Sequence, residues 1–183
     1  MRKFFGSLLE VIEVAVVAIA AVLVIRAFLI QPFLVSGDSM VPTFHNSDYL
    51  LIDELTYRLR PPARGEVVVF RYPKDEKVFF IKRIVGLPGE RVEISGGEVT
   101  IVNGEHPQGL KLDEPYINGE MKTSGEEDMT LGAGQYFVLG DNRPYSLDSR
   151  SWGTVSSREI VGLVRVRLLP LGSFGTFSPP AYK

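Results

Sequence analysis

The chain has 183 residues, of which 45% are hydrophobic and 23% charged, and this length suits one main folded domain. Its formal net charge of −2 lacks the positive excess that nucleic-acid binding normally requires, so a nucleic-acid partner is not expected. The sequence has no cysteine, which excludes disulfides, cysteine-based zinc sites and thiol nucleophiles. A nucleophile must therefore be sought among the hydroxyl groups.

The N-terminal segment is the most apolar part of the chain, rich in Val, Ala, Ile, Leu and Phe up to residue 35. Its charge-free stretch, residues 14–25, is too short at about 1.5 Å per residue to cross about 30 Å of hydrocarbon. Residues 8–31 are long enough if Glu13 and Arg26 lie near the two interfaces. We therefore predict one transmembrane helix over residues 8–31.

Arg2 and Lys3 precede this segment, and positively charged residues favour the cytoplasmic side of a membrane. This predicts that residues 1–7 are cytoplasmic and that the chain after residue 31 lies on the extracytoplasmic face. A cleavable secretory signal peptide and a buried amphipathic helix are the alternatives. The apolar run ends without an A-x-A cleavage site and is unusually rich in β-branched residues and Ala, which favours the anchor.

After Pro32 the chain changes to short apolar runs punctuated by Gly, Pro and Asn, a pattern typical of a mostly β domain. The expected strands are Tyr49–Ile52, Val67–Tyr72, Val78–Val85, Arg91–Ile94, Glu98–Val102, Tyr136–Leu139 and Ile160–Leu168. Gly96-Gly97 and Asn103-Gly104 are tight-turn signals on either side of one of these strands. They predict a small β-hairpin module within residues 91–131.

Two later segments lack a strong pattern. Residues 105–130 are rich in Glu, Asp, Gly and Lys and are interpreted as a surface excursion, with the acidic run 126–128 as a solvated loop. Residues 176–183 contain Pro179-Pro180 and few groups to bury, so a flexible tail is expected.

Three clusters carry residues suited to chemistry, and the first is S-G-D-S-M-V-P-T-F at residues 36–44. Gly37 allows backbone angles that are closed to other residues, and Pro42 fixes a bend. Ser39 can therefore be presented on a tight turn with its own N–H directed outward, a geometry that suits a nucleophile. An ordinary serine-rich loop is the alternative.

In the second cluster, residues 78–89, a lysine interrupts a strand. The period of two places Lys82 on the same face as Val78, Phe80 and Ile84, whereas Lys77 lies in the preceding turn. Lys82 is thus the lysine whose side chain is expected to be most removed from solvent. Lowering its pKa from about 10.4 to about 8 would take roughly 3 kcal/mol and yield a neutral amine that can accept a serine proton. An edge-strand lysine that reaches solvent is the alternative.

The third cluster, residues 140–153, is dense in hydrogen-bonding groups. Asp148 and Arg150 can form an ion pair, and Ser146 can orient a neighbouring amine, although a loop held by Asx-turns would show the same composition. His45 and His106 lie in polar turns, so neither a Ser-His-Asp triad nor a metal site is expected.

Together, in this order and after one N-terminal apolar segment, the three clusters closely resemble the bacterial type I signal peptidases. The resemblance runs through residues 25–28, S-G-D-S-M-V-P-T-F, residues 64–70, K-R-I-V-G-L-P-G and G-D-N-R-P-Y-S-L-D-S-R, and leaves out residues 95–130. It implies a mostly β, signal-peptidase-like catalytic domain over residues 32–175, with a smaller β insertion at about 91–131. Lysine in the second motif, where endoplasmic-reticulum relatives carry histidine, indicates the bacterial or organellar branch.

The resemblance implies a membrane-bound endopeptidase of the bacterial cytoplasmic membrane that removes N-terminal signal peptides from exported preproteins. Its partners would be those preproteins and the lipid bilayer, and no cofactor is implied. By motif position, Ser39 attacks the scissile carbonyl and Lys82 acts as general base. Ser146 is expected to hydrogen-bond the lysine amine, while Asp148 and Arg150 hold the loop.

The resemblance also implies an oxyanion hole and two substrate subsites. The Ser39 N–H is one expected donor, but Gly37 stands where part of the family has a serine hydroxyl, so the second donor is unidentified. Cleavage is implied after small residues at −1 and −3 of an extended peptide. The expected subsite walls are Phe33, Val35, Met40, Phe80 and Ile81.

Three other functions share parts of this pattern. A catalytically inactive, membrane-tethered β protein is disfavoured because Ser39 and Lys82 are both present. A relative of the Ser-Lys self-cleaving repressors would need a DNA-binding domain, and none fits ahead of Ser39. The same motifs are compatible with an organellar processing peptidase.

Overall fold

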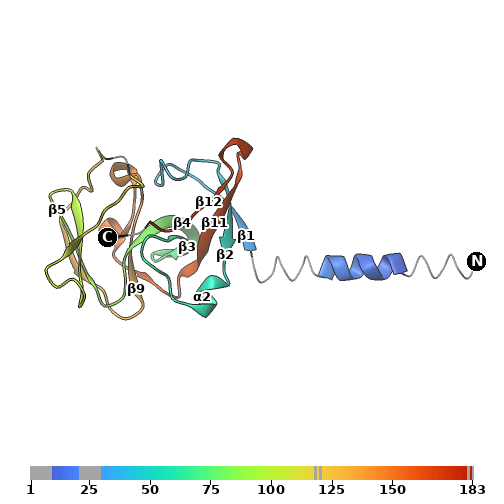
Figure 1. Ribbon diagram of the computed structural model, residues 1–183, viewed down its shortest axis with the longest axis horizontal. Coiled ribbons are helices and arrows are strands. Elements are labelled where there is room, and N and C mark those ends of the chain that lie inside the picture. The colour runs from blue at the N-terminus through green and yellow to red at the C-terminus, as the bar shows by residue number, and fades with distance from the viewer. Residues whose placement is uncertain (1–9, 21–29, 118, 120, 181, 183) are drawn as a thin grey trace, which may run out of the picture.

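The computed structural model describes residues 10–20, 30–117, 119, 121–180 and 182 (Figure 1). Residues 10–20 form a helix whose residues are all exposed. Within the described residues, no helix combines the length and the apolar character needed to cross a bilayer. Residues 8, 9 and 21–29 of the predicted anchor and the predicted cytoplasmic segment 1–7 lie outside the described residues.

The C-terminal boundary predicted for the anchor is wrong. Residues 30 and 31 belong to strand β1 (Ile30–Leu34), where they pair with Asp53 and Ile52 of the neighbouring strand. The sequence pattern missed this strand because it continues directly from the apolar N-terminal run.

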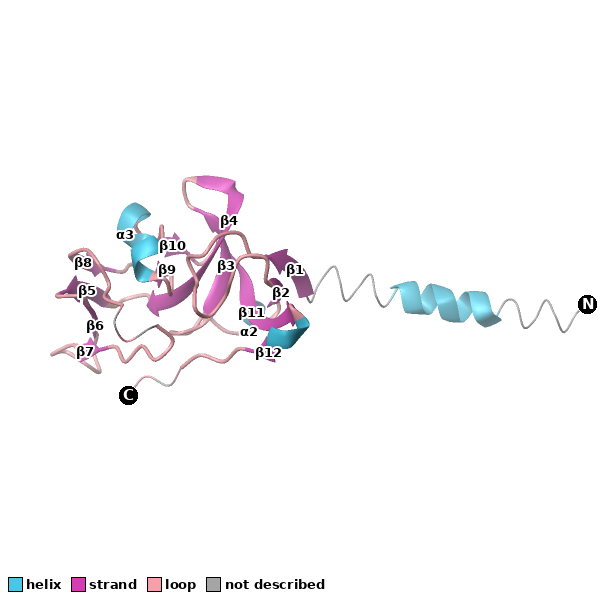
Figure 2. Cartoon of the chain, turned by 90° about the horizontal axis from the view of Figure 1, so that it is seen from above, coloured by secondary structure: helices cyan, strands magenta, loops and turns pink. Residues whose placement is uncertain are grey.

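The main body is a mostly antiparallel sheet of eight strands (Figures 1 and 2). Its order is β1, β2 (Tyr49–Asp53), β11 (Ile160–Leu169), β3 (Val67–Tyr72), β4 (Asp75–Gly86), β9 (Gln135–Leu139) and β10 (Val155–Ser156), with β12 (Gly175–Thr176) paired to β11. The sheet brings the start of the domain beside its end, since β2 pairs with β11. Helices in this body are single turns, namely α2 (Thr56–Leu59), α3 (Ser149–Trp152), η1 (Arg143–Tyr145) and η2 (Leu171–Ser173).

A smaller four-stranded sheet lies at the end of the body opposite β1 (Figure 2). Its order is β7 (Leu110–Lys111), β6 (Glu98–Val102), β5 (Arg91–Ser95) and β8 (Glu127–Thr130). The inward residues of β5 and β6, which alternate with exposed or partly exposed ones, pack with Phe137 and Leu139 of β9. The smaller sheet therefore shares a core with the main one.

The two turn signals have different outcomes. Gly96 and Gly97, with φ of 61° and 90°, join β5 to β6 as a two-residue hairpin, which confirms the first. Asn103-Gly104 does not form such a hairpin, because Asn103 Oδ1 accepts the N–H groups of Glu105 and His106 and the chain loops on to β7.

All seven expected strands are present. The acidic run 126–128 was interpreted as a loop, but Glu127 and Asp128 belong to β8, where Asp128 pairs with Arg91 of β5. That cross-strand ion pair lets an acidic sequence occupy a strand. Besides β1, the pattern missed β7 and β8 of the smaller sheet and β10 and β12 of the main sheet, which have two to four residues each.

The C-terminal tail, expected to be flexible, packs against the body. The Phe177 ring lies 4.4 Å from that of Phe44 between centroids, and the Tyr182 hydroxyl donates to that of Tyr116 at 3.3 Å. At Gly65 an added Cβ would lie 2.8 Å from Pro180 Cδ, so the tail crosses directly over this backbone. Two aromatic rings thus supply the buried area that a proline-rich sequence did not suggest.

Candidate active site

The serine turn, residues 36–44, carries Ser39 and is anchored to the core by two apolar side chains. Met40 and Phe44 are 1% and 0% exposed and belong to the core beside β2. Gly37 has φ of 92°, a conformation that side chains other than glycine rarely adopt, as its place in the sequence predicted. Ser39 is held at the surface of this core.

Lys82 lies within β4, and its side chain reaches Ser39 of the serine turn. Lys82 Nζ donates to Ser39 Oγ at 2.8 Å and to the Ile81 carbonyl at 2.8 Å. The lysine is 3% exposed, and its ammonium lies 5.3 Å from the centre of the Phe80 ring. Ser39 and Lys82, 43 positions apart in sequence, are thus in direct contact.

Burial of Lys82 lowers the pKa of its amine from 10.5 to about 8, because the charged form is desolvated. The negative charges of Asp148 and Asp141 act in the opposite direction and hold the pKa above the value that burial alone would give. About a tenth of the amine is therefore neutral at pH 7, far more than for a lysine in water. Such an amine can accept a proton from the serine hydroxyl.

The loop after β9 carries the expected ion pair of Asp148 and Arg150. Arg150 Nε lies 2.8 Å from Asp148 Oδ1, and the two side chains are 9% and 0% exposed. Asp148 Oδ2 also accepts the Gly140 N–H at 3.0 Å, while Arg150 donates to the Arg143 carbonyl at 2.7 Å. The pair ties together the two ends of the loop.

Ser146 does not make the expected hydrogen bond to Lys82. Its Oγ is buried and has no partner among the described residues. It lies instead against Gly140, where an added Cβ would be 2.0 Å from Ser146 Oγ and 2.5 Å from the Ser39 carbonyl. Gly140, which the sequence reasoning did not single out, thus permits the loop to contact the serine turn.

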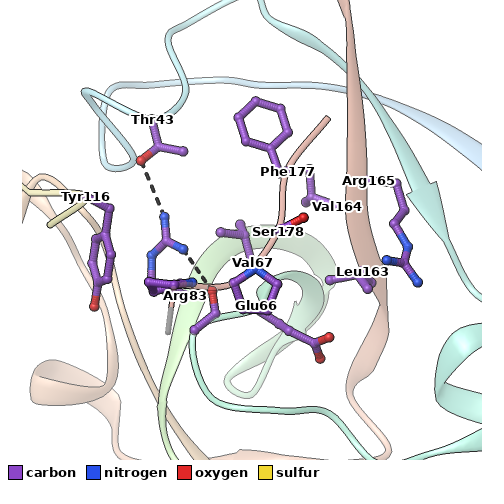
Figure 3. A pocket seen from close by; sticks show the side chains of 13 residues that line it. Thr43, Glu66, Val67, Arg83, Tyr116, Leu163, Val164, Arg165, Phe177 and Ser178 are labelled. Carbon is purple, nitrogen blue, oxygen red and sulfur yellow. Dashed lines mark hydrogen bonds between the residues drawn. The ribbon is translucent and has the colours of Figure 1, made fainter. Parts of the chain in front are cut away.

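Arg83 and Asp141 form a second buried ion pair that sequence reasoning missed. Arg83 Nη2 and Nε donate to the two Asp141 oxygens at 2.6 and 2.9 Å, and Thr43 Oγ1 donates to Asp141 Oδ2 at 2.5 Å. Figure 3 shows Arg83 between Thr43 and the Tyr116 ring, which lies 3.9 Å from the guanidinium carbon. The sequence does place Arg83 directly after Lys82 in the same strand. Because neighbouring residues of a strand face opposite sides of the sheet, the sequence could have placed Arg83 on the face opposite Lys82.

A third buried pair links the insertion to the loop. Arg143, 1% exposed, donates to Glu114 Oε2 at 2.9 Å and also bonds Thr123. Arg150 further donates to the Ser124 carbonyl at 3.1 Å. Residues 105–130, expected to be only a surface excursion, therefore hold the arginines of the loop.

An open groove of about 380 Å³ runs over Ser39 and Lys82. Four of the five expected subsite residues line it, Phe33, Val35, Phe80 and Ile81. Met40 is the exception, because its side chain points into the core. The groove is bordered by β1 and β4, two strands that can flank an extended peptide.

The N–H groups of the turn differ in their partners. The Ser39 N–H makes no hydrogen bond to any of the described residues. The Gly37 N–H donates to Asn46 Oδ1 at 2.9 Å and is therefore occupied. The Ser39 N–H, on the residue that carries the nucleophile, is therefore free of acceptors among the described residues and available for an oxyanion.

The family model described as "Signal peptidase, peptidase S26" matches residues 8–169. The chain belongs to this family. The resemblance seen in the three motifs is thereby confirmed, and a signal peptidase of this family is a serine protease, a hydrolase.

Proteins with similar sequences are also called signal peptidases. Signal peptidase I from Leptolyngbya laminosa is 35% identical over 186 residues, which cover 97% of this chain and 88% of that protein. Probable signal peptidase I-2 from Synechocystis sp. is 39% identical over 186 residues, 94% of this chain and 78% of that protein. A crystal structure of a signal peptidase I from Enterococcus faecalis matches with a TM-score of 0.48 and 30% identity, covering 57% of this chain and 97% of that one. These sequence relatives group the chain with the bacterial type I signal peptidases.

Proposed function

We propose that this chain removes N-terminal signal peptides from exported preproteins with Ser39 as nucleophile and Lys82 as general base. The observation that carries the proposal is the 2.8 Å hydrogen bond between Lys82 Nζ and Ser39 Oγ, made by a lysine that is 3% exposed. Desolvation lowers the pKa of that amine to about 8. A base of this strength suits proton transfer near neutral pH.

In this mechanism Ser39 Oγ attacks the scissile carbonyl carbon while its proton passes to the neutral Lys82 amine. The Ser39 N–H donates to the oxygen on which negative charge develops. The intermediate then collapses, and the Lys82 ammonium gives the proton to the leaving amine. A water molecule, deprotonated by Lys82, hydrolyses the acyl-enzyme and restores Ser39.

The proposed substrate is an extended peptide laid along the groove, cut after small residues at −1 and −3. Phe33, Val35, Phe80 and Ile81 make the walls of the groove apolar, which suits alanine side chains. Ile81 lines the groove and packs against the core that holds Met40, so its side chain is placed to limit the size of a residue at −1. Ile81→Ala is expected to admit a larger residue there, and an unchanged preference would remove Ile81 from the subsite.

The proposed location is the bacterial cytoplasmic membrane, with one N-terminal anchor ahead of β1 and the β domain on the extracytoplasmic face. Support comes from the apolar sequence of residues 8–29 and from the exposure of its described part. Val11, Val14 and Val17 are 63%, 69% and 63% exposed, a large apolar surface for a helix in water. Protease protection of the N-terminus in sealed inside-out vesicles, instead of exposure, would overturn this orientation.

The decisive experiment is cleavage of a preprotein with alanine at −1 and −3 by the purified full chain in detergent. Mass spectrometry of the product identifies the cleaved bond. Ser39→Ala and Lys82→Met are expected to abolish cleavage, while Lys77→Met, which alters an exposed lysine at the start of the same strand, retains it. Full activity of either dyad variant would overturn the mechanism.

A further inference from the structure

One residue of the loop after β9 holds two consecutive carbonyl groups of the serine turn. The Asn142 N–H donates to the Ser39 carbonyl at 3.0 Å, and Asn142 Nδ2 donates to the Asp38 carbonyl at 2.9 Å. Asn142 is itself fixed on both sides. Its carbonyl accepts the Tyr145 N–H at 2.9 Å, and the preceding residue, Asp141, is paired with Arg83.

The side-chain bond has a consequence for the next N–H group. The peptide bond between Asp38 and Ser39 is planar and trans, so its carbonyl oxygen and its N–H point in opposite directions. The Asp38 carbonyl accepts the Val41 N–H at 3.2 Å as well, but the Asn142 amide is its shorter bond and the one that comes from outside the turn. Holding this carbonyl toward Asn142 therefore directs the Ser39 N–H away from Asn142. Asp38 and Ser39 both border the groove, and this N–H has no acceptor among the described residues.

We propose that Asn142 is a positioning residue that aims the Ser39 N–H at the oxyanion of the tetrahedral intermediate. The inference rests on the proposed function. It matters here because Gly37 has no side chain to donate and its N–H is occupied by Asn46. The Ser39 N–H is the donor on the nucleophilic residue itself, so its direction determines how well it stabilises the developing charge.

The side-chain amide can be separated from the backbone bond by substitution. Asn142→Asp keeps the shape and the backbone N–H but replaces the Nδ2 donor by an oxygen that repels the Asp38 carbonyl. Asn142→Ala removes the side chain without adding charge. Asn103→Ala is the matched control, because Asn103 Nδ2 donates to Glu90 at 2.8 Å next to the ends of β6 and β5, and neither residue lines the groove.

Three measurements on the full chain in detergent test the role. Both Asn142 variants are expected to lower kcat by about 10- to 100-fold while KM changes by less than about twofold, because the oxyanion exists only in the transition state. Inhibition by a peptide aldehyde, which forms a tetrahedral oxyanion adduct with Ser39, is expected to weaken by a similar factor. The pH of half-maximal kcat/KM is expected to stay unchanged in Asn142→Ala, and Asn103→Ala is expected to match the parent.

The role is refuted if kcat of both variants stays within about twofold of the parent. It is also refuted if substrate affinity and aldehyde affinity fall together, or if the pH profile of Asn142→Ala shifts, since these results would indicate a general loosening of the site. Asn142→Asp covers the case in which the alanine variant fails to fold. An active parent with an inactive Ser39→Ala and unaffected Asn142 variants would overturn this role alone, whereas an inactive parent would overturn the proposed function with it.

Discussion

Burial of Lys82 costs folding free energy, and this cost predicts a pH-dependent gain in stability when the lysine is replaced by methionine. The pKa of the amine is about 8 in the folded chain against 10.5 for a free lysine. Below pH 8 the amine is protonated in both states, and the difference of pKa corresponds to about 3 kcal/mol of lost stability at roughly 1.36 kcal/mol per unit. As the pH rises from 8 to 10.5 the folded state loses the proton first, and the cost disappears.

Lys82→Met keeps an unbranched apolar side chain and removes the charge. It also removes the hydrogen bonds of Lys82 Nζ to Ser39 Oγ and to the Ile81 carbonyl, both 2.8 Å, and any dependence of these bonds on protonation is already contained in the pKa of the folded state. The way in which the difference in unfolding free energy between variant and parent changes with pH therefore reports the titration of the lysine. We expect the unfolding free energy of Lys82→Met, measured relative to that of the parent, to fall by about 2 to 3 kcal/mol between pH 7 and pH 10.

Urea unfolding at several pH values, followed by the fluorescence of Trp152, measures this difference, because Trp152 is the single tryptophan of the chain. Lys77→Met, at an exposed position of the same strand, is the control and is expected to give a difference that does not change with pH. A difference for Lys82→Met that stays constant within about 1 kcal/mol from pH 7 to pH 10 would refute the argument that burial lowers the pKa.

Three further predictions follow from the same contacts. The value of kcat/KM is expected to rise about tenfold from pH 7 to pH 9, because the neutral form of an amine with pKa of about 8 grows from about a tenth to about nine tenths; a flat profile would contradict a lysine base. Gly140→Ala is expected to lower kcat about 100-fold, since its Cβ would lie 2.5 Å from the Ser39 carbonyl; parental kinetics would show that the turn can yield. Glu114→Gln leaves the Arg143 charge buried without its partner and is expected to cost about 3 kcal/mol in urea unfolding, whereas Glu98→Gln, in an exposed pair, should cost under about 1 kcal/mol; equal costs would contradict the assignment.

The strands could be predicted where the relevant information is local. Alternation along Glu98–Val102 and the Gly96-Gly97 turn specify one hairpin without reference to the rest of the chain. The first strand could not be found this way, since Ile30 and Gln31 continue an apolar run and become a strand by pairing with β2. The tail was misjudged for a related reason, because Phe177 and Tyr182 find their partners across the fold.

The site residues also divide into those that local sequence predicts and those that depend on contacts across the fold. The period of two placed Lys82 on one face of its strand, and the motifs joined it to Ser39. Asn142 lies 104 positions from Asp38, and no sequence pattern indicates that its amide meets that carbonyl. The contacts of Glu114 with Arg143 likewise span 29 positions. Supporting contacts of this kind depend on how the sheets assemble, whereas the reacting groups are recognisable from their chemical type.

The serine turn has to serve two environments with opposite requirements. Lys82 needs a dry, apolar niche, because hydration would return the pKa of its amine toward 10.5 and leave little neutral base. The oxyanion donor needs the open groove, where the scissile carbonyl arrives. Ser39 meets both demands by directing its Oγ down to the buried amine while its N–H stays free of acceptors among the described residues. The hydroxyl is fixed by one bond to the lysine, so the peptide plane needs separate restraints, and the Asp38 carbonyl receives them from the Val41 N–H at 3.2 Å within the turn and from the Asn142 amide at 2.9 Å across the fold.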